Sequence, residues 1–220
     1  MLHAPAAEKN KEPIGVALSH FGPFSQHDSG KTYKCLELGS GSGEHAAHLG
    51  KLFPYVVWQP TEYQGDVGPE WVPEEMRDEF SNFNSIKEHT KLLSNVLPPI
   101  ELDAADAVWP GVIESQKWDA VFAANVFHAA PYGVAIGIIA GAARVLDPEA
   151  GGLFVYDTFK LEGKVFSHSI PISPTCHAPF FPDLTCISVF FGSTRPRRIA
   201  NTTGRSSRRM LIGVCATRLS

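Results

Sequence analysis

A glycine-rich stretch with acidic neighbours is the part of this sequence whose spacing best suits ligand binding. It reads CLELGSGSGEHAAH over residues 35–48, with Gly39, Gly41 and Gly43 at alternate positions. Turns of this kind bring backbone N–H groups close to nucleotide-like ligands. A nucleoside triphosphate loop needs a lysine directly after its last glycine, but the first lysine here is Lys51. The spacing therefore excludes a triphosphate loop at this position.

Two other ligands fit a glycine turn, and each needs different residues around it. A dinucleotide fingerprint needs a third glycine where this chain has Glu44. An acid, Glu37, two residues before Gly39 resembles the first motif of Rossmann-like S-adenosylmethionine-dependent methyltransferases. The amino-acid end of such a methyl donor needs an acceptor for its ammonium and N–H groups for its carboxylate. We therefore expect the donor at Glu37, Gly39, Ser40, Gly41 and Gly43, with a dinucleotide or an empty tight turn as alternatives.

Two downstream acids extend the predicted donor site. Glu62 ends the segment WQPTE, where a carboxylate could accept both hydrogen bonds of an adenosine ribose. Asp103 ends the segment IELD and could accept from an adenine amino group. The alternatives are a surface glutamate at 62, Asp106 in place of Asp103, or Asp103 as a helix cap.

The elements that must position these residues alternate between strands and helices. Such alternation predicts an α/β fold, a Rossmann-like doubly wound and mostly parallel sheet of the class I methyltransferase type, with ligands at the carboxyl ends of the strands. The apolar runs predict strands over 33–39, 55–62, 98–106, 118–131 and 153–159, and helices over 44–53, 82–96 and 132–152.

Polar residues after the fourth and fifth predicted strands lie where an acceptor would enter. Asn125 opens the loop after the fourth strand, and we assign it to the donor site. His128 is a candidate general base, because its unperturbed pKa of about 6.5 permits proton removal near neutrality. It could instead shape the loop through a backbone hydrogen bond. Tyr156 and Lys160 are candidate contacts to the methyl acceptor.

The N-terminal arm, residues 1–30, carries further candidates. Its apolar residues suit one face of a helix broken near Pro13, and they are Ile14, Val16, Leu18 and Phe21. Asn10, with Glu8 and Lys11, could form a lid over the donor and touch the substrate. His45 and His48 lie three apart beside Glu44, but no third ligand stands at a diagnostic spacing, so we expect no metal site.

Composition limits the remaining possibilities. With 220 residues, 44% of them hydrophobic, one core is the default, and the net charge of −4 argues against a nucleic-acid partner. The apolar segments are too short for a membrane helix, and the first residues do not form a signal peptide, which predicts a cytoplasmic protein, with the nucleus also open. The four cysteines lack metal or disulfide spacing.

Beyond single motifs, residues 4–164 resemble a named family, the small methyltransferase-like proteins grouped with methyltransferase-like protein 26. The segments that carry the resemblance occur in the same order, and they are AAEKNKEPI, LELGSGSGEHAAHLGKLFP, WQPTE, PPIELDAADAVWP, AANVFHAAP and YDTFKLEGK. The resemblance implies a methyltransferase fold with an S-adenosylmethionine site, and it implies no acceptor substrate. The chain departs from the family at Asp157, which places an acid near the expected substrate mouth.

The segment 165–220 differs in kind from the methyltransferase-like domain over 31–164. It holds seven arginines, no lysine and one acid, a net charge of +6, and no family motif is recognisable in it. We expect a replaced C-terminus that lacks the closing strand pair of the fold, although 184–191 and 210–217 could form strands. If this tail removed the acceptor pocket, the chain would bind S-adenosylmethionine without catalysis. The lesser alternative is an NAD(P)-dependent reductase.

Overall fold

The computed structural model describes residues 1–25, 30–65 and 81–157, together with the backbone of four later strands. The elements follow in this order: α1 (Pro5–Leu18), α2 (Gly22–Ser25), β1 (Tyr33–Leu38), α3 (Glu44–Leu52), β2 (Val56–Glu62), α4 (Asn82–Thr90), β3 (Ile100–Glu101), α5 (Gly111–Glu114), β4 (Ala120–Ala124), α6 (Tyr132–Val145), β5 (Gly152–Tyr156), β6 (Lys160–Leu161), β7 (Lys164–Val165), β8 (Thr185–Phe190) and β9 (Leu211–Ala216).

One seven-stranded sheet organises the molecule, in the order β3-β2-β1-β4-β5-β8-β9. Strands β1 to β5 pair in parallel, β8 pairs antiparallel to β5, and β9 pairs antiparallel to β8. This arrangement is the Rossmann-like fold of class I methyltransferases, as the alternating sequence pattern predicted. The short strands β6 and β7 form a separate hairpin.

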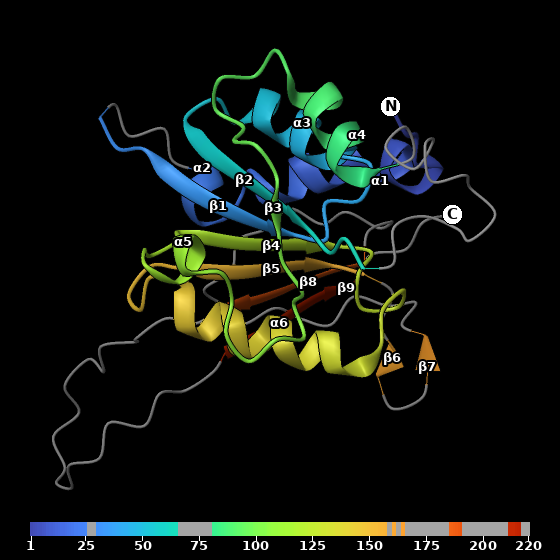
Figure 1. The fold of residues 1–220 in the computed structure, drawn as a ribbon. Coiled ribbons are helices and arrows are strands. Elements are labelled where there is room, and N and C mark those ends of the chain that lie inside the picture. The colour runs from blue at the N-terminus through green and yellow to red at the C-terminus, as the bar shows by residue number, and fades with distance from the viewer. Residues whose placement is uncertain are drawn as a thin grey trace, which may run out of the picture.

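Helices cover both faces of the sheet (Figure 1). Alternate residues of each strand point to opposite faces, so Cys35 and Phe122 join the core under α1, α2 and α3. Leu36 and Val121, one position along, join the core under α5 and α6. Because both faces are buried, the central strands are apolar throughout, as is typical of parallel sheets.

The β1–β4 boundary is the point where the strand order of this sheet reverses. The chain runs outward from β1 to β2 and β3, then returns to the other side of β1 as β4. The loops after β1 and β4 therefore diverge to opposite faces, and ligands of such sheets bind in the crevice that results. The glycine turn follows β1 and Asn125 follows β4, so both predicted groups lie at this switch point.

Several predicted elements need correction. Helix α1 continues through Pro13, because the buried Ile14 and Leu18, which follow Pro13, hold this part of the helix on the core. Val16, predicted on the apolar face, is exposed. Helix α4 ends at Thr90, where the predicted helix extended to residue 96. Within the described residues, no helix combines the length and the apolar character needed to span a membrane.

The tail contains the antiparallel pair that we expected it to lack. Strands β8 and β9 lie within the two runs named as possible strands, and they extend the sheet beyond β5. Without β8, β5 would be an edge strand with unpaired backbone N–H and C=O groups. The antiparallel pairing with β8 satisfies these groups. The acidic segment 66–80 and the rest of 165–220 lie outside the described residues.

Candidate functional site

The glycine turn joins β1 to α3 through three left-handed residues. Gly39, Gly41 and Gly43 have φ of 66°, 54° and 90°, a region that residues with a Cβ rarely adopt. A Cβ on Gly43 would lie 2.6 Å from the Ile86 Cα, and one on Gly39 would lie 2.9 Å from the Val126 Cγ2. A Cβ on Gly41 would meet nothing within 4 Å. The outer two glycines thus permit close packing, whereas the middle one borders open space.

Glu62, at the end of β2, lies against this turn. Its Oε2 accepts a hydrogen bond of 2.6 Å from the Gly41 N–H. Burial raises the pKa of the Glu62 carboxyl, while hydrogen bonds from the Gly41 and Tyr63 amides and from Asn82 oppose the rise. The β1–β2 register aligns Leu38 with Thr61, which places Glu62 beside the first residue of the turn. Glu62 is therefore partly buried and hydrogen-bonded to the turn, unlike a fully solvated surface glutamate.

Glu37 is a buried acid on β1, the strand next to the one that carries Glu62. Only 2% of it is exposed, and its Oε2 accepts a hydrogen bond of 2.8 Å from the Trp58 indole N–H. Burial raises the pKa of Glu37 to about 7, the Trp58 N–H opposes this shift, and the charge of Glu62 adds to it. The buried Ser40 hydroxyl also lowers the pKa, although it makes no hydrogen bond of regular geometry.

Asp103 follows β3 in a partly buried turn. Its Oδ1 accepts a hydrogen bond of 2.8 Å from the Ala105 N–H, and the Asp106 N–H donates to the Asp103 carbonyl. The Asp103 carboxylate therefore caps a turn, and it is not the helix cap that the sequence allowed as one alternative, because no helix begins here. An adenine contact would have to use the other carboxylate oxygen.

Three residues from the loops after β4 and β5 meet on the far side of the switch point. Asn125 has φ of 59°, which Asn tolerates better than most residues, and its N–H donates to the Tyr156 carbonyl. The His128 Nδ1 lies 2.6 Å from the Asp157 Oδ1. The Asp157 Oδ2 accepts a hydrogen bond of 2.7 Å from the Phe127 N–H. Asp157 therefore holds both the ring and the backbone of the loop.

Two predicted substrate residues are part of the interior. Tyr156 is 8% exposed and packs in the core under α1 to α3, which corrects its placement at the mouth. Asn10 is 5% exposed, and its Oδ1 accepts a hydrogen bond of 2.7 Å from His45 Nε2. Asn10 thus fastens α1 to α3 instead of facing a substrate. The side chain of Lys160 lies outside the described residues.

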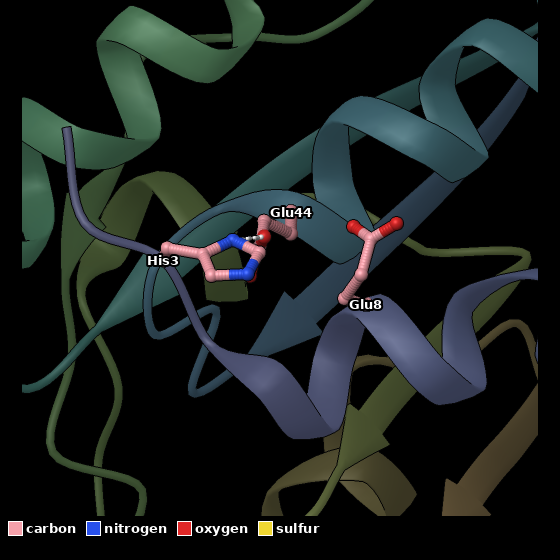
Figure 2. Close-up of side chains that lie close together, drawn as sticks. All are labelled: His3, Glu8 and Glu44. Atoms are coloured by element: carbon pink, nitrogen blue, oxygen red, sulfur yellow. Dashed lines mark ion pairs between the residues drawn. The ribbon is translucent and has the colours of Figure 1, made fainter.

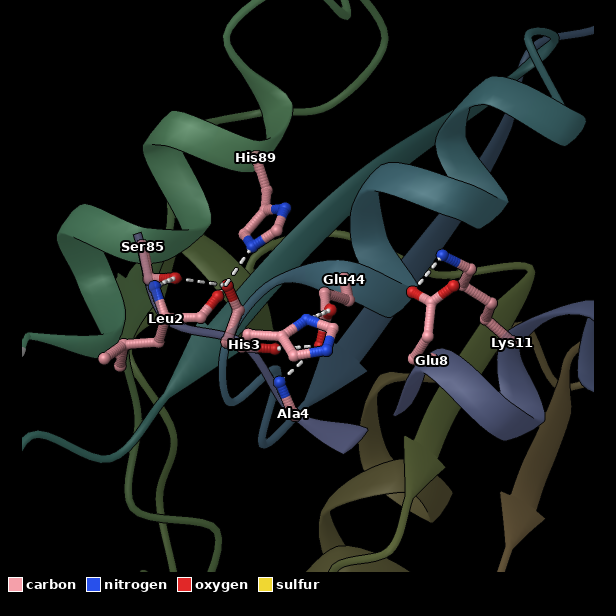
Figure 3. Close-up of polar contacts among 9 residues, drawn as sticks. Leu2, His3, Ala4, Glu8, Lys11, Glu44, Ser85 and His89 are labelled. Atoms are coloured by element: carbon pink, nitrogen blue, oxygen red, sulfur yellow. Dashed lines mark hydrogen bonds and ion pairs between the residues drawn. The ribbon is translucent and has the colours of Figure 1, made fainter. Parts of the chain in front are cut away.

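The first residues of the arm bind to α3 and α4 (Figure 3). The Glu44 Oε2 accepts hydrogen bonds from the Ala4 N–H and the Ser42 hydroxyl, and its Oε1 lies 2.6 Å from the His3 Nδ1. Burial alone would raise the pKa of Glu44, but these three contacts together lower it. Glu44, at the position where a dinucleotide fingerprint has glycine, therefore holds the arm in place.

Within the described residues, one group of His and acidic side chains is close enough to share a metal ion. It consists of His3, Glu8 and Glu44, and its potential ligand atoms lie within 4.8 Å of one another (Figure 2). The Glu8 carboxylate already pairs with Lys11, and that of Glu44 with His3. These ion pairs account for the grouping. His45 and His48 are not part of it.

Beside this cluster lies a cavity of about 630 Å³ between α1, α3 and α4. Glu8 and Lys11 of the predicted lid line it, but none of the residues assigned to the donor does, nor do Asn10, His128 and Tyr156. The residues assigned to the donor lie instead at the carboxyl ends of β1 to β4, where ligands of such sheets bind.

Sequence reasoning named His128 and noticed Asp157, but it did not pair them. They are 29 residues apart, and only the alignment of Ala124 with Tyr156 across β4 and β5 brings them together. The signal that could have found the pair was topological: residues directly after adjacent parallel strands lie at the same edge of the sheet.

Solved structures of methyltransferases are similar to this chain. An O-methyltransferase family protein from Burkholderia thailandensis matches with 18% identity and a TM-score of 0.50, over 71% of this chain and 40% of that one. Coclaurine N-methyltransferase bound to N-methylheliamine and SAH matches with 12% identity and a TM-score of 0.47, over 71% of this chain and 38% of that one. PKMT2 from Rickettsia typhi in complex with AdoHcy matches with 18% identity and a TM-score of 0.43, over 67% of this chain and 24% of that one.

These similarities concern the fold alone, and this chain spans at most two fifths of the length of those three proteins. A family model matches residues 1–171. The chain thus belongs to the DUF938 family, whose description is "protein of unknown function".

Proposed function

We propose that this protein binds S-adenosylmethionine at the glycine turn and transfers its methyl group to an acceptor that enters beside the loop after β4. The observation that carries the proposal is a pair of acids beside a left-handed glycine turn at the switch point: Glu37, which is buried, and Glu62, which is partly buried and accepts a hydrogen bond from the turn. The class I methyltransferase fold and the resemblance to the methyltransferase-like protein 26 group support it.

Charge favours a methyl donor over a dinucleotide. Three carboxylates, Glu37, Glu44 and Glu62, surround the turn between β1 and α3. S-adenosylmethionine carries an ammonium, a sulfonium and one carboxylate, so its net charge is positive. A dinucleotide would bring a negatively charged pyrophosphate to the same helix N-terminus, close to Glu44, whose lowered pKa keeps it ionised.

The residues present fit this donor. The open space beside Gly41 can accept a ligand against the backbone, and Glu62 Oε2 is already directed at this turn. Glu62 would accept from the ribose hydroxyls, and Glu37 would stabilise the ammonium. When bound, S-adenosylmethionine supplies an electrophilic methyl group. The protein's part is mainly to bind, align and exclude water, because alignment alone accelerates group transfer strongly.

Turnover of labelled donor tests the proposal. Protein incubated with methyl-labelled S-adenosylmethionine and cell extract should transfer label, and a Glu62→Gln variant should transfer much less at limiting donor. Glu101→Gln is the matched control, because Glu101 is the exposed register partner of Glu62 on β3. Equal transfer with and without the protein, despite donor binding, would favour the non-catalytic alternative.

A further inference from the structure

We infer that the methyl acceptor is a hydroxyl group, of an alcohol or a phenol, and that His128 removes its proton while Asp157 positions His128. This inference rests on the proposed function and assigns the chemical class of the second substrate. Nothing in the fold or the family description specifies it.

The geometry at His128 separates a buried end from an accessible end. The Asp157 side chain is fully buried, whereas 52% of the His128 side chain is exposed. The ring contacts Asp157 through Nδ1, at 2.6 Å. Nε2 lies across the ring from this contact. A half-exposed imidazole held at one nitrogen by a buried carboxylate is the arrangement of a base oriented by an acid.

Hydrogen bonding at Asp157 fixes which nitrogen carries the proton. A carboxylate only accepts hydrogen bonds, and the Phe127 N–H donates to the second oxygen of Asp157. The Nδ1 of a neutral His128 is therefore the protonated nitrogen, and Nε2 keeps its lone pair. That lone pair is the group that can take a proton from an acceptor at the mouth of the crevice.

The presence of a base discriminates among acceptor classes. Carboxylates are already ionised at neutral pH and need none, and a thiol with a pKa near 8.5 ionises to a useful extent without one. A hydroxyl is neutral, with a pKa of about 10 even for a phenol, so its reactivity depends on proton removal. A cationic ammonium acceptor is recognised best by an unpaired carboxylate, and in the described loop 125–130 and at 156–157 the one acid, Asp157, is buried and already accepts hydrogen bonds.

His128 Nε2 takes the hydroxyl proton, the acceptor oxygen forms a bond to the methyl carbon, and the carbon–sulfur bond breaks with its electron pair remaining on sulfur. The positive charge of the sulfonium thus reappears on the imidazolium, which Asp157 stabilises. The proton then leaves His128 for solvent through its exposed side.

Nitrogen NMR of the full chain labelled at histidine tests the positioning without any acceptor. Loss of signals in His128→Gln assigns the ring. We expect Nδ1 protonated and Nε2 unprotonated in the wild type, and an altered tautomer balance in Asp157→Asn. A wild-type ring protonated at Nε2 alone would overturn the inference, and this reading does not depend on how well the variant folds.

Methyl transfer tests the acceptor class. Wild-type protein is given ¹³C-methyl S-adenosylmethionine and cell extract, and the labelled carbon is classified by its chemical shift. We expect the wild type to form a methoxyl product. The His128→Gln variant should form it roughly 100-fold or more slowly. The affinity of this variant for S-adenosylhomocysteine should stay within about twofold of the wild-type value. An N-, C- or S-methyl product, or full activity of His128→Gln, would overturn the inference while the proposed function stands. Donor binding without transfer would also overturn it. Absence of donor binding would instead defeat the proposed function.

Discussion

On the β1–β2 side of the switch point, the buried Glu37 and the partly buried Glu62 lie beside a backbone turn, whereas on the β4–β5 side a half-exposed imidazole contacts a buried carboxylate. Glu62 accepts from the Gly41 amide, so this side is shaped to contact a ligand through fixed groups. His128 has one nitrogen held and the other side of its ring open. In the function that we propose, the first side binds the donor and the second removes a proton, so changes on each side should affect different measurements.

The largest expected effect separates two glycines of one turn. Gly43→Ala should destabilise the fold by about 3 kcal/mol, because its Cβ would collide with the backbone of α4 at a positive φ. Gly41→Ala is the matched control and should cost only about 1 kcal/mol, since its Cβ meets open space. Urea unfolding measures both. Equal losses would mean that the turn does not pack on Ile86 as described.

The next effect concerns donor affinity. Glu62→Gln should weaken S-adenosylhomocysteine binding roughly tenfold to a hundredfold, because hydrogen bonds to a charged acceptor are lost. Glu101→Gln, one strand further out and exposed, should leave the affinity unchanged. Calorimetric titration compares the two. If both variants bound more weakly, the loss would come from the reduced negative charge of the protein and not from a contact made by Glu62.

How much of this site the sequence could predict depends on the range of each contact. The glycine spacing and the position of Glu62 are local features, read from a strand, a turn and the next strand, and the structure places them together. Tyr156 was misplaced because alternation along β5 decides which face it occupies, and that face is the core under α1 to α3. The pairing of His128 with Asp157 depends on strand order, which residue types alone do not encode.

The third effect is a pH dependence that originates at Glu37. Since its pKa in the free protein is about 7, a donor ammonium near it must displace a proton at lower pH. Affinity should therefore rise about tenfold between pH 6 and pH 8 and then level off. Glu37→Gln should flatten this profile. An unchanged profile would place the ammonium away from Glu37.

Stability of the ligand-free protein should respond to Glu37 with the opposite sign. A raised pKa contributes stability that is complete below pH 4.5 and is lost as pH rises through about 7. His45 acts oppositely, because burial lowers its pKa to about 4, so its contribution is complete above pH 6.5 and is lost as pH falls through about 4. Unfolding curves of Glu37→Gln between pH 6.5 and 8 isolate the first contribution.

The smallest expected effect concerns the contacts that hold the N-terminal arm on α3. Glu44→Gln should reduce the free energy of unfolding by about 1 kcal/mol, since it weakens the contacts to His3, Ala4 and Ser42. The control is Glu8→Gln, whose exposed ion pair with Lys11 should contribute about 0.5 kcal/mol or less. Thermal unfolding resolves the difference. A larger loss in the Glu8 variant would contradict the role assigned to Glu44.

The claim that the glycine turn holds a methyl donor is tested most directly by calorimetric titration of the wild-type protein. S-adenosylhomocysteine and NAD would each be titrated at pH 7.5 under identical conditions. We predict one bound S-adenosylhomocysteine per chain and no heat of binding for NAD. Binding of NAD without binding of S-adenosylhomocysteine would contradict the account.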